Sequence, residues 1–151
     1  MSFAVDSNIL VYAFDSTAGD RHEAAAALME RAPLADCTLI AQCLAEFLNV
    51  IRRKQPTYFN EATEQASRWA KTLPVLHTSA EHVINGALFS ARYKLQLFDS
   101  IIWQIACASS IDVFLSEDLQ DGFEAEGMRV LDPFVAANSL LVEALLTESE
   151  S

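Results

Sequence analysis

Short apolar runs alternate along this chain with longer segments that carry apolar residues at helical spacing. The clearest runs are 3–5, 37–41, 111–115 and 128–131, and each is followed by a polar residue. Runs of this length are typical of strands buried on both faces, which occur in parallel sheets covered by helices. The sequence therefore predicts an α/β fold, a three-layer α/β/α sandwich with a central parallel sheet.

Helical periodicity and capping signals place the remaining elements. Asp6 or Ser7 is expected to cap the first helix, and Asn60 to cap a later one. Asp20-x-x-Glu23 and Thr78-x-x-Glu81 have the form of capping boxes. A short, weak strand is expected at 74–77. We expect helices near 9–14, 20–32, 42–53, 60–73, 78–91, 99–109 and 132–146.

The size and composition of the chain fit one globular domain. It has 151 residues, of which 52% are hydrophobic, and only 4 Gly and 4 Pro. This length is typical of a single domain, and the low Gly and Pro content argues against disorder. We expect one domain over 1–151 with a polar tail from Thr147 to Ser151.

The chain shows no sequence signal for membrane association. The first residues lack the charged start and apolar stretch of a signal peptide. No uninterrupted apolar run reaches the roughly 18–20 residues that span a bilayer. The three cysteines are odd in number and form no CxxC pair, as in reduced cytosolic proteins. We therefore expect a cytoplasmic protein without membrane association.

Four acidic residues lie just after the apolar runs or on the helices that follow them: Asp6, Glu46, Asp99 and Asp118. Ligands of α/β folds bind outside the carboxyl ends of the strands, and hard divalent cations take clustered oxygen ligands. Four acids brought together there would hold Mg²⁺ or Mn²⁺, and a metal held by such ligands commonly acts on phosphate. The pattern predicts a metal-dependent nuclease.

Each acid also has a structural explanation when it is taken alone. Asp6 could be an N-cap, and the helix dipole would stabilise Asp99 at a helix start. Asp118 lies in a sequence suited to a turn. Glu46 falls on the helix face opposite Leu44 and its apolar neighbours, where a solvent-facing residue is the usual case. The argument for a site therefore depends on the set rather than on any one member.

The formal charge of −11 is unusual for a protein that binds nucleic acid, because neutralising phosphate dominates such binding. A bound divalent cation would reverse the local sign at a carboxylate cluster. Basic residues are also clustered, at 52–54 and between 68 and 94. The acidity argues against tight non-specific RNA binding and favours a narrow substrate or a basic protein partner.

The four acids lie in four short segments: VDSNIL (5–10), AEFLNV (45–50), LFDSIIW (97–103) and LSEDLQDG (115–122). These segments resemble the motifs of PIN-domain ribonucleases, and most of all those of the VapC-type toxins of bacterial toxin–antitoxin pairs. The resemblance extends over nearly the whole chain, as far as 130–134.

The resemblance implies a fold and a set of site residues. PIN domains are α/β/α sandwiches whose acids meet at the carboxyl edge of a parallel sheet. Asp6, Glu46 and Asp99 would be the core metal ligands, and either Asp118 or Asp121 would complete the site. The ion, Mg²⁺ or Mn²⁺, would activate water and stabilise charge on the scissile phosphate. Hydrogen bonds to ligands or phosphate would come from Ser7, Asn8, Ser116 and, if it is not a ligand, Asp121.

The resemblance also implies partners. VapC-like proteins cleave single-stranded or structured RNA, often tRNA or rRNA, and commonly form homodimers. A cognate antitoxin blocks them by reaching into the acidic site, often with an Arg. A chain of charge −11 suits a basic antitoxin segment. A nuclease that matures ribosomal RNA without an antitoxin is an alternative within the same family.

Two other classes of protein are alternatives to a nuclease. A haloacid-dehalogenase-like phosphatase or a receiver domain also places an Asp after a strand, but the segment from Asp6 to Asn8 lacks the second Asp of a DxD motif. No Lys follows the later strands to bind a phosphoryl group. A non-catalytic PIN-like interaction module would be expected to lack some of the four acids, and this sequence has all four.

Overall fold

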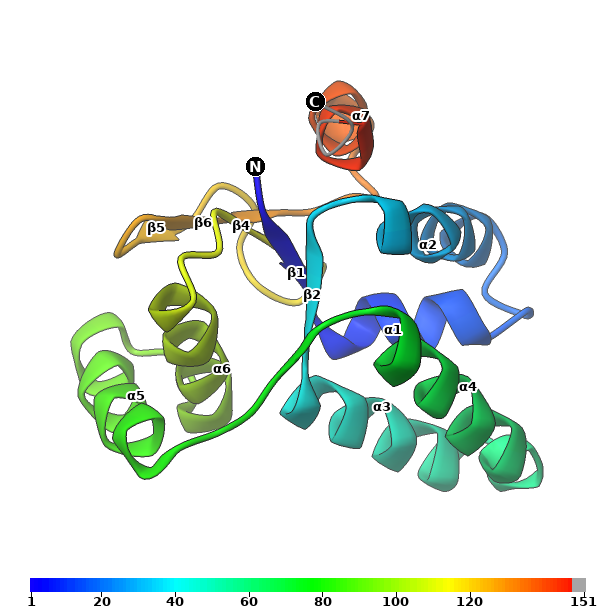
Figure 1. Cartoon of the computed structure of the whole chain (residues 1–151), viewed down its shortest axis with the longest axis horizontal. Coiled ribbons are helices and arrows are strands. Elements are labelled where there is room, and N and C mark those ends of the chain that lie inside the picture. The colour runs from blue at the N-terminus through cyan, green and yellow to red at the C-terminus, as the bar shows by residue number, and fades with distance from the viewer. Residues whose placement is uncertain (148–151) are drawn as a thin grey trace.

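The computed structural model describes residues 1–147, and a mostly parallel sheet runs through its centre. In this part of the chain the sheet has six strands in the order β3-β2-β1-β4-β6-β5 (Figure 1). All neighbouring strands pair in parallel except β5 and β6. The strands are β1 Phe3–Val5, β2 Cys37–Ile40, β3 Val75–Leu76, β4 Val113–Leu115, β5 Glu124–Ala125 and β6 Met128–Leu131.

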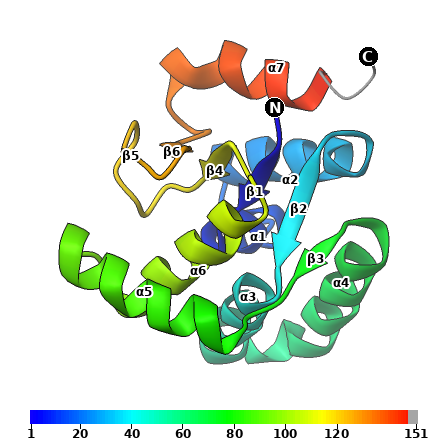
Figure 2. The same ribbon diagram turned by 60° about the vertical axis from the view of Figure 1, so that its left-hand side comes forward.

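Helices cover both faces of this sheet, as expected for a three-layer sandwich. Figure 2 shows α7 on one side of the sheet and α5 and α6 on the other. The helices are α1 Ser7–Phe14, α2 Asp20–Arg31, α3 Ala41–Lys54, α4 Phe59–Thr72, α5 Ala80–Tyr93, α6 Leu97–Ala108 and α7 Ser139–Thr147. Among the described residues, no helix is both long and apolar enough to cross a bilayer.

The core forms because the strand residues are buried on both sides. Every residue of β1 and β4 is buried, which matches the unbroken apolar runs in the sequence. Trp103 of α6 packs edge-on against Phe114 of β4, with ring centroids 6.3 Å apart. The prediction that 99–109 forms a mostly buried helix is confirmed by α6, although the helix begins two residues earlier, at Leu97.

Several predicted element starts were wrong in detail. Gly19, not Asp20, is the N-cap of α2, and it makes no side-chain cap bond. The capping box of α5 pairs Ser79 with His82 in place of Thr78 with Glu81. Asn60 lies inside α4 rather than at its cap. A polar residue near a helix start fits several positions, and only the backbone decides which one has the extended geometry of a cap.

The C-terminal segment also differs from the prediction. Asp132-Pro133 does not start a helix; α7 begins at Ser139, after a short 3₁₀ turn at Ala136–Asn138. β5 was not predicted, because two residues carry too little pattern to be read as a strand. Residues 148–151 of the expected polar tail lie outside the described part of the chain.

The order of the strands fixes where a ligand site can form. From β1 the chain moves to β2 and β3 on one side, and later returns to place β4 on the other side of β1. Ligands of open α/β sheets bind at such a reversal, outside the carboxyl ends of the strands. Here the reversal lies between β1 and β4, which end at Val5 and Leu115.

Candidate metal centre

Asp6 lies directly at this reversal and is almost fully buried, with 5% of its surface exposed. It follows β1 and caps α1, and its Oδ1 accepts a hydrogen bond from the Ser7 backbone N–H at 2.8 Å. Burial, together with the smaller effects of the nearby Asp99 and Asp118 charges, outweighs two lowering hydrogen bonds and raises the pKa of Asp6 to about 6. A buried carboxylate with this environment is costly to keep as a cap alone.

Ser116 connects Asp6 to the segment that follows β4. Its hydroxyl donates to Asp6 Oδ2 at 2.7 Å and accepts from the backbone N–H groups of Asp118, at 3.2 Å, and Leu119, at 3.3 Å. Asn8 Nδ2 also donates to Ser116 Oγ, at 3.3 Å. One buried hydroxyl therefore fixes both the first acid and the backbone of the fourth.

Glu46 lies in the N-terminal half of α3 and is half-buried. Its Oε1 is buried and has no hydrogen-bond partner among the described residues. Burial raises the pKa of Glu46 to about 7, with further contributions from Asp6, Asp99 and Asp118. The helix face expected to be solvent-facing therefore faces the other acids instead. A buried, unpaired carboxylate oxygen is a position that a cation would satisfy.

Asp99 and Asp118 complete the set. Asp99 lies in the first turn of α6, and burial together with the charge of Asp118 raises its pKa. Asp118 is exposed, and its charge also contributes to the raised pKa of Asp6 and of Glu46. The fold thus brings the four predicted acids from four different segments within electrostatic reach of one another.

The other predicted site residues have different surroundings. The Asp121 Oδ1 accepts from the Asp132 backbone N–H at 2.9 Å and from Asn138 Nδ2 at 3.1 Å. These bonds tie Asp121 to the segment that leads into α7, so of the two alternatives the structure favours Asp118 as the member of the cluster. Ser7 contributes its backbone N–H to Asp6. Asn8 contacts Ser116 and, through its Oδ1, accepts from the Glu117 N–H at 3.1 Å.

The donor set suits Mg²⁺ or Mn²⁺, since it consists of carboxylate oxygens. Over residues 1–147, however, no three Asp, Glu, His or Cys side chains are placed so that they could hold an ion in their present positions. Asp6 is fixed by its two hydrogen bonds. The exposed Asp118 and the unpaired Glu46 oxygen are the groups that could turn toward a cation, so the site fits a metal by chemistry and requires side-chain rotation to bind it.

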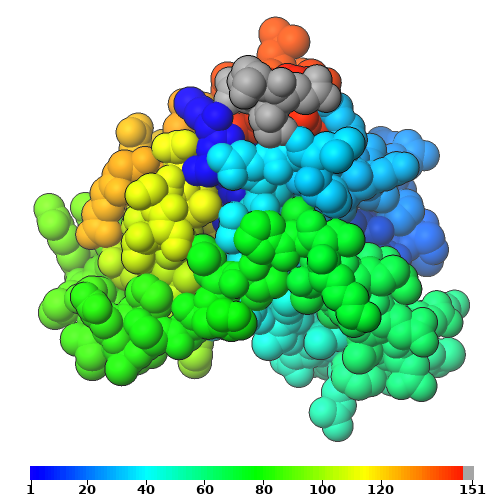
Figure 3. Space-filling model, in the orientation of Figure 1, coloured from blue at the N-terminus to red at the C-terminus, as the bar shows by residue number. Residues whose placement is uncertain are grey.

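An open groove of about 460 Å³ lies beside the acids, between α3 and the start of α6. Figure 3 shows the outline of the molecule indented between the helices of residues 80–108 and those of residues 41–72. The groove is lined by the side chains of Gln42, Ala45, Glu46, Asn49, Gln96, Phe98 and Asp99. The lining contains amides, carboxylates and an aromatic ring but no basic side chain.

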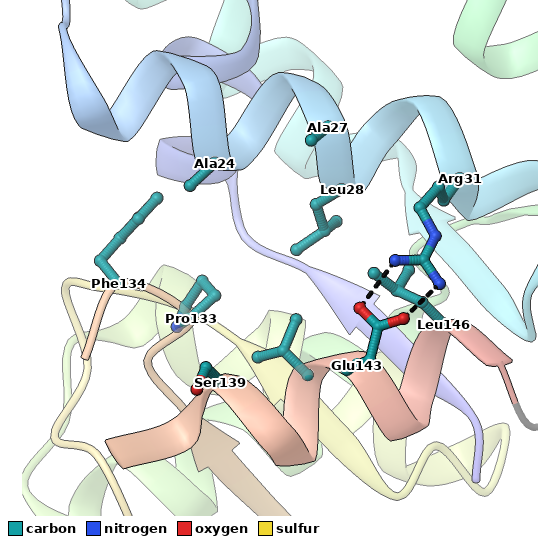
Figure 4. A pocket seen from close by; sticks show the side chains of 10 residues that line it. Ala24, Ala27, Leu28, Arg31, Pro133, Phe134, Ser139, Glu143 and Leu146 are labelled. Carbon is teal, nitrogen blue, oxygen red and sulfur yellow. Dashed lines mark hydrogen bonds and ion pairs between the residues drawn. The ribbon is translucent and has the colours of Figure 1, made fainter. Parts of the chain in front are cut away.

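A second cavity, of about 200 Å³, lies between α2 and α7 (Figure 4). Its lining is mainly apolar and includes Leu28 and Phe134. At one end Arg31 pairs with both carboxylate oxygens of Glu143, at 2.7 and 2.8 Å. None of the four acids lines this cavity, so it is separate from the candidate metal centre.

Comparison with known protein families agrees with this arrangement. The model of the PIN domain family matches residues 3–124, which contain all four acids. The chain belongs to the PIN-domain family. A search of curated proteins gives no match to this PIN domain.

Solved structures share the fold of this PIN domain at low sequence identity. Mycobacterium tuberculosis VapC20, described as a sarcin-ricin loop cleaving toxin, is 16% identical with a TM-score of 0.64; the match covers 78% of this chain and 90% of that one. A toxin–antitoxin complex from Klebsiella pneumoniae is 22% identical with a TM-score of 0.61, covering 88% and 98%. DNA-bound VapBC from Salmonella typhimurium is 14% identical with a TM-score of 0.62, covering 87% and 98%.

The contacts around Glu117, which directly precedes Asp118, were not predicted from the sequence. Its carboxylate is bound by Tyr12 of α1 and Arg21 of α2. These residues lie 105 and 96 positions away from Glu117 in the chain. Neither spacing nor local pattern could have paired them.

Proposed function

We propose that this PIN domain is a metal-dependent endoribonuclease and the toxin of a VapBC-type toxin–antitoxin pair. The observation that carries the proposal is the convergence of Asp6, Glu46, Asp99 and Asp118 at the carboxyl edge of the sheet, with raised pKa values for the first three. Perturbed carboxyl groups gathered in this way are typical of functional sites. Membership in the PIN-domain family and the fold shared with VapC structures support the same function.

Each acid would have a defined part in this activity. Asp6, held rigid by Ser7 and Ser116, would be the fixed ligand for Mg²⁺ or Mn²⁺, and Glu46, Asp99 and Asp118 would close around the ion. When bound, the metal supplies activation of water and neutralisation of charge on the scissile phosphate. The groove beside the acids would receive the RNA strand. Because no basic side chain lines that groove, phosphate neutralisation would depend on the metal.

The proposed partners follow from charge and from the related structures. The complexes from Klebsiella pneumoniae and Salmonella typhimurium contain a toxin with its antitoxin. A net charge of −11 and an acidic centre would favour a basic antitoxin segment here. We also propose a homodimer in the cytoplasm, with structured or single-stranded RNA such as tRNA or rRNA as the substrate.

Cleavage of total cellular RNA by the purified, antitoxin-free protein tests the function. We expect discrete fragments with Mg²⁺ or Mn²⁺ and none with EDTA. Asp99→Asn should abolish the fragments, whereas Asp112→Asn, which alters an exposed acid on the other end of β4, should not. Cleavage by the Asp99→Asn protein at the rate of the unmodified protein would disprove the proposed site.

One observation favours a second candidate, a non-catalytic PIN-like interaction module. No three of the described acidic, His or Cys side chains are already placed around a metal position. Binding of Mn²⁺ separates the two functions, because a ligand that binds only the folded state raises the melting temperature. A nuclease should show this rise and a non-catalytic module should not. A phosphatase, the other alternative, would hydrolyse a generic phosphomonoester.

A further inference from the structure

Glu117 is held by side chains from two helices that are remote in the sequence. Its Oε1 accepts a hydrogen bond from the Tyr12 hydroxyl at 2.7 Å, and its Oε2 pairs with Arg21 Nε at 2.5 Å. The Arg21 guanidinium lies over the rings of Tyr12, at 5.9 Å, and Phe134, at 5.4 Å. These two rings meet edge to face, with centroids 5.3 Å apart. Glu117 is therefore part of a packed unit and not an isolated surface ion pair.

The backbone beside Glu117 is fixed as well. The Glu117 N–H donates to Asn8 Oδ1 at 3.1 Å, and the next N–H, of Asp118, donates to Ser116 Oγ at 3.2 Å. These two hydrogen bonds fix the backbone of residues 117 and 118. The Glu117 carboxylate links the same residues to α1 and α2. Asp118 follows directly and is itself exposed. Its side chain has no hydrogen bond within residues 1–147, so its position depends on the residues that precede it.

We propose that Glu117, held by Tyr12 and Arg21, is a positioning residue that sets where the Asp118 carboxylate lies relative to Asp6 and Asp99. This inference rests on the proposed function, because it assigns Asp118 to the metal centre. Glu117 itself does not touch the ion. Residues that orient metal ligands typically change metal affinity or activity by about 10–100-fold when they are removed.

The partial burial of the Glu117 carboxylate, and the rings beneath its Arg21 partner, support this role over that of a solvated contact. The Glu117 side chain is 20% exposed and that of Arg21 is 49% exposed. An exposed ion pair alone contributes little, because solvent screens it. Here the guanidinium also stacks on two rings, and the hydrogen bond from Tyr12 raises the pKa of that phenol. Such a network restricts a loop more than a single pair does.

A double-mutant cycle with Asp118 tests the proposal. Three quantities are measured: the Mn²⁺ concentration that gives half of the maximal rise in melting temperature, and kcat and KM for RNA cleavage. Glu117→Ala should raise the half-maximal Mn²⁺ concentration and lower kcat, each by about tenfold, with KM nearly unchanged. In an Asp118→Asn background the same substitution should change either quantity by less than about twofold, because the residue it positions is already disabled.

Two further variants separate positioning from simple loss of stability. Glu117→Gln keeps an acceptor for Tyr12 and Arg21, so it should recover part of the Mn²⁺ affinity. Glu143→Ala breaks the ion pair with Arg31, which lies between α2 and α7 away from the acids (Figure 4), and should leave Mn²⁺ affinity unchanged. A structural role alone would lower the melting temperature without altering the Mn²⁺ dependence.

These measurements test the positioning role of Glu117 separately from the proposed nuclease function. Unchanged Mn²⁺ dependence in Glu117→Ala, or an equal effect of Glu117→Ala with and without Asp118, would overturn the positioning role while the nuclease function stands. Mn²⁺ binding without RNA cleavage by the unmodified protein would overturn the nuclease function, and the Mn²⁺ cycle would still decide the role of Glu117. Absence of Mn²⁺ binding by the unmodified protein would overturn both.

Discussion

The Ser116 hydroxyl donates a hydrogen bond to Asp6 Oδ2 at 2.7 Å, joining two residues that are 110 positions apart in the chain. Both are buried, and they follow adjacent parallel strands, β1 and β4. The bond partly offsets the cost of burying the Asp6 carboxylate, because a hydrogen bond to the charged form favours that form. It also ties the first acid of the candidate centre to the segment that carries the fourth.

Removing this hydroxyl should damage the site and the fold together. We expect Ser116→Ala to lower the free energy of unfolding by about 2 kcal/mol, because Asp6 loses a donor and two backbone N–H groups lose an acceptor. RNA cleavage should fall as well. Urea denaturation and a cleavage assay measure the two effects. Ser109→Ala, at an exposed position, is the matched control; an equal loss in both variants would contradict the assigned role.

Neutralising Glu46 should have opposite effects on activity and stability. Its Oε1 is buried without a partner among the described residues, and burial together with three other carboxylates raises its pKa. We expect Glu46→Gln to abolish cleavage and to stabilise the metal-free protein at pH 8 by about 1 kcal/mol, after allowing for the half-exposed environment. Thermal melts in EDTA measure the gain. Glu64→Gln, on the exposed face of α4, should change neither property.

The stability of the metal-free protein should fall as the pH rises. The pKa is raised to about 6 for Asp6 and to about 7 for Glu46, against ordinary carboxyl values in the unfolded chain. A group whose pKa is raised by folding stabilises the protein at low pH, and this contribution is lost as the pH passes through the folded-state pKa. We expect the free energy of unfolding to drop by about 2 kcal/mol from pH 5 to pH 8 in EDTA.

Metal and mutation provide the controls for this pH dependence. Mn²⁺ at pH 8 should restore stability, because the cation compensates the ionised carboxylates. Glu46→Gln should flatten the pH dependence, since one of the two groups no longer titrates. A pH profile in EDTA that rises between pH 5 and pH 8 would show that these carboxyl groups are not perturbed in the way the structure indicates.

Gly86 of α5 lies directly against Ile101 of α6. A Cβ at this position would lie 2.6 Å from Ile101 Cγ1 and 2.9 Å from Ile101 Cα. Gly86→Ala should therefore destabilise the protein by about 1–3 kcal/mol, despite the better helix propensity of alanine. Since α6 carries Asp99, cleavage should weaken too. Ala87→Ser, one residue along and exposed, tests whether the effect is specific; a neutral Gly86→Ala would show that the helices can separate at no cost.

Much of this architecture could be predicted from the chain alone. The apolar runs at 3–5 and 128–131 formed strands with the predicted limits, because their residues are buried and therefore apolar, apart from the exposed Arg129. Asp6 could be assigned to the end of a strand for the same reason. The cap positions of α2, α4 and α5 and the start of α7 could not be predicted, because several polar residues nearby satisfy the same local preference.

Local sequence determined which residues form strands and helices, and which acids stand at their ends. Tertiary structure alone decided that Glu46 turns toward the other acids rather than solvent, that Asp121 bonds to the C-terminal segment, and that Tyr12 and Arg21 hold Glu117. The physical reason is the distance along the chain over which each kind of interaction acts. Strand and helix preferences act over a few residues, whereas the pKa of a carboxylate and the partner of a side chain depend on groups brought close by the order of the strands.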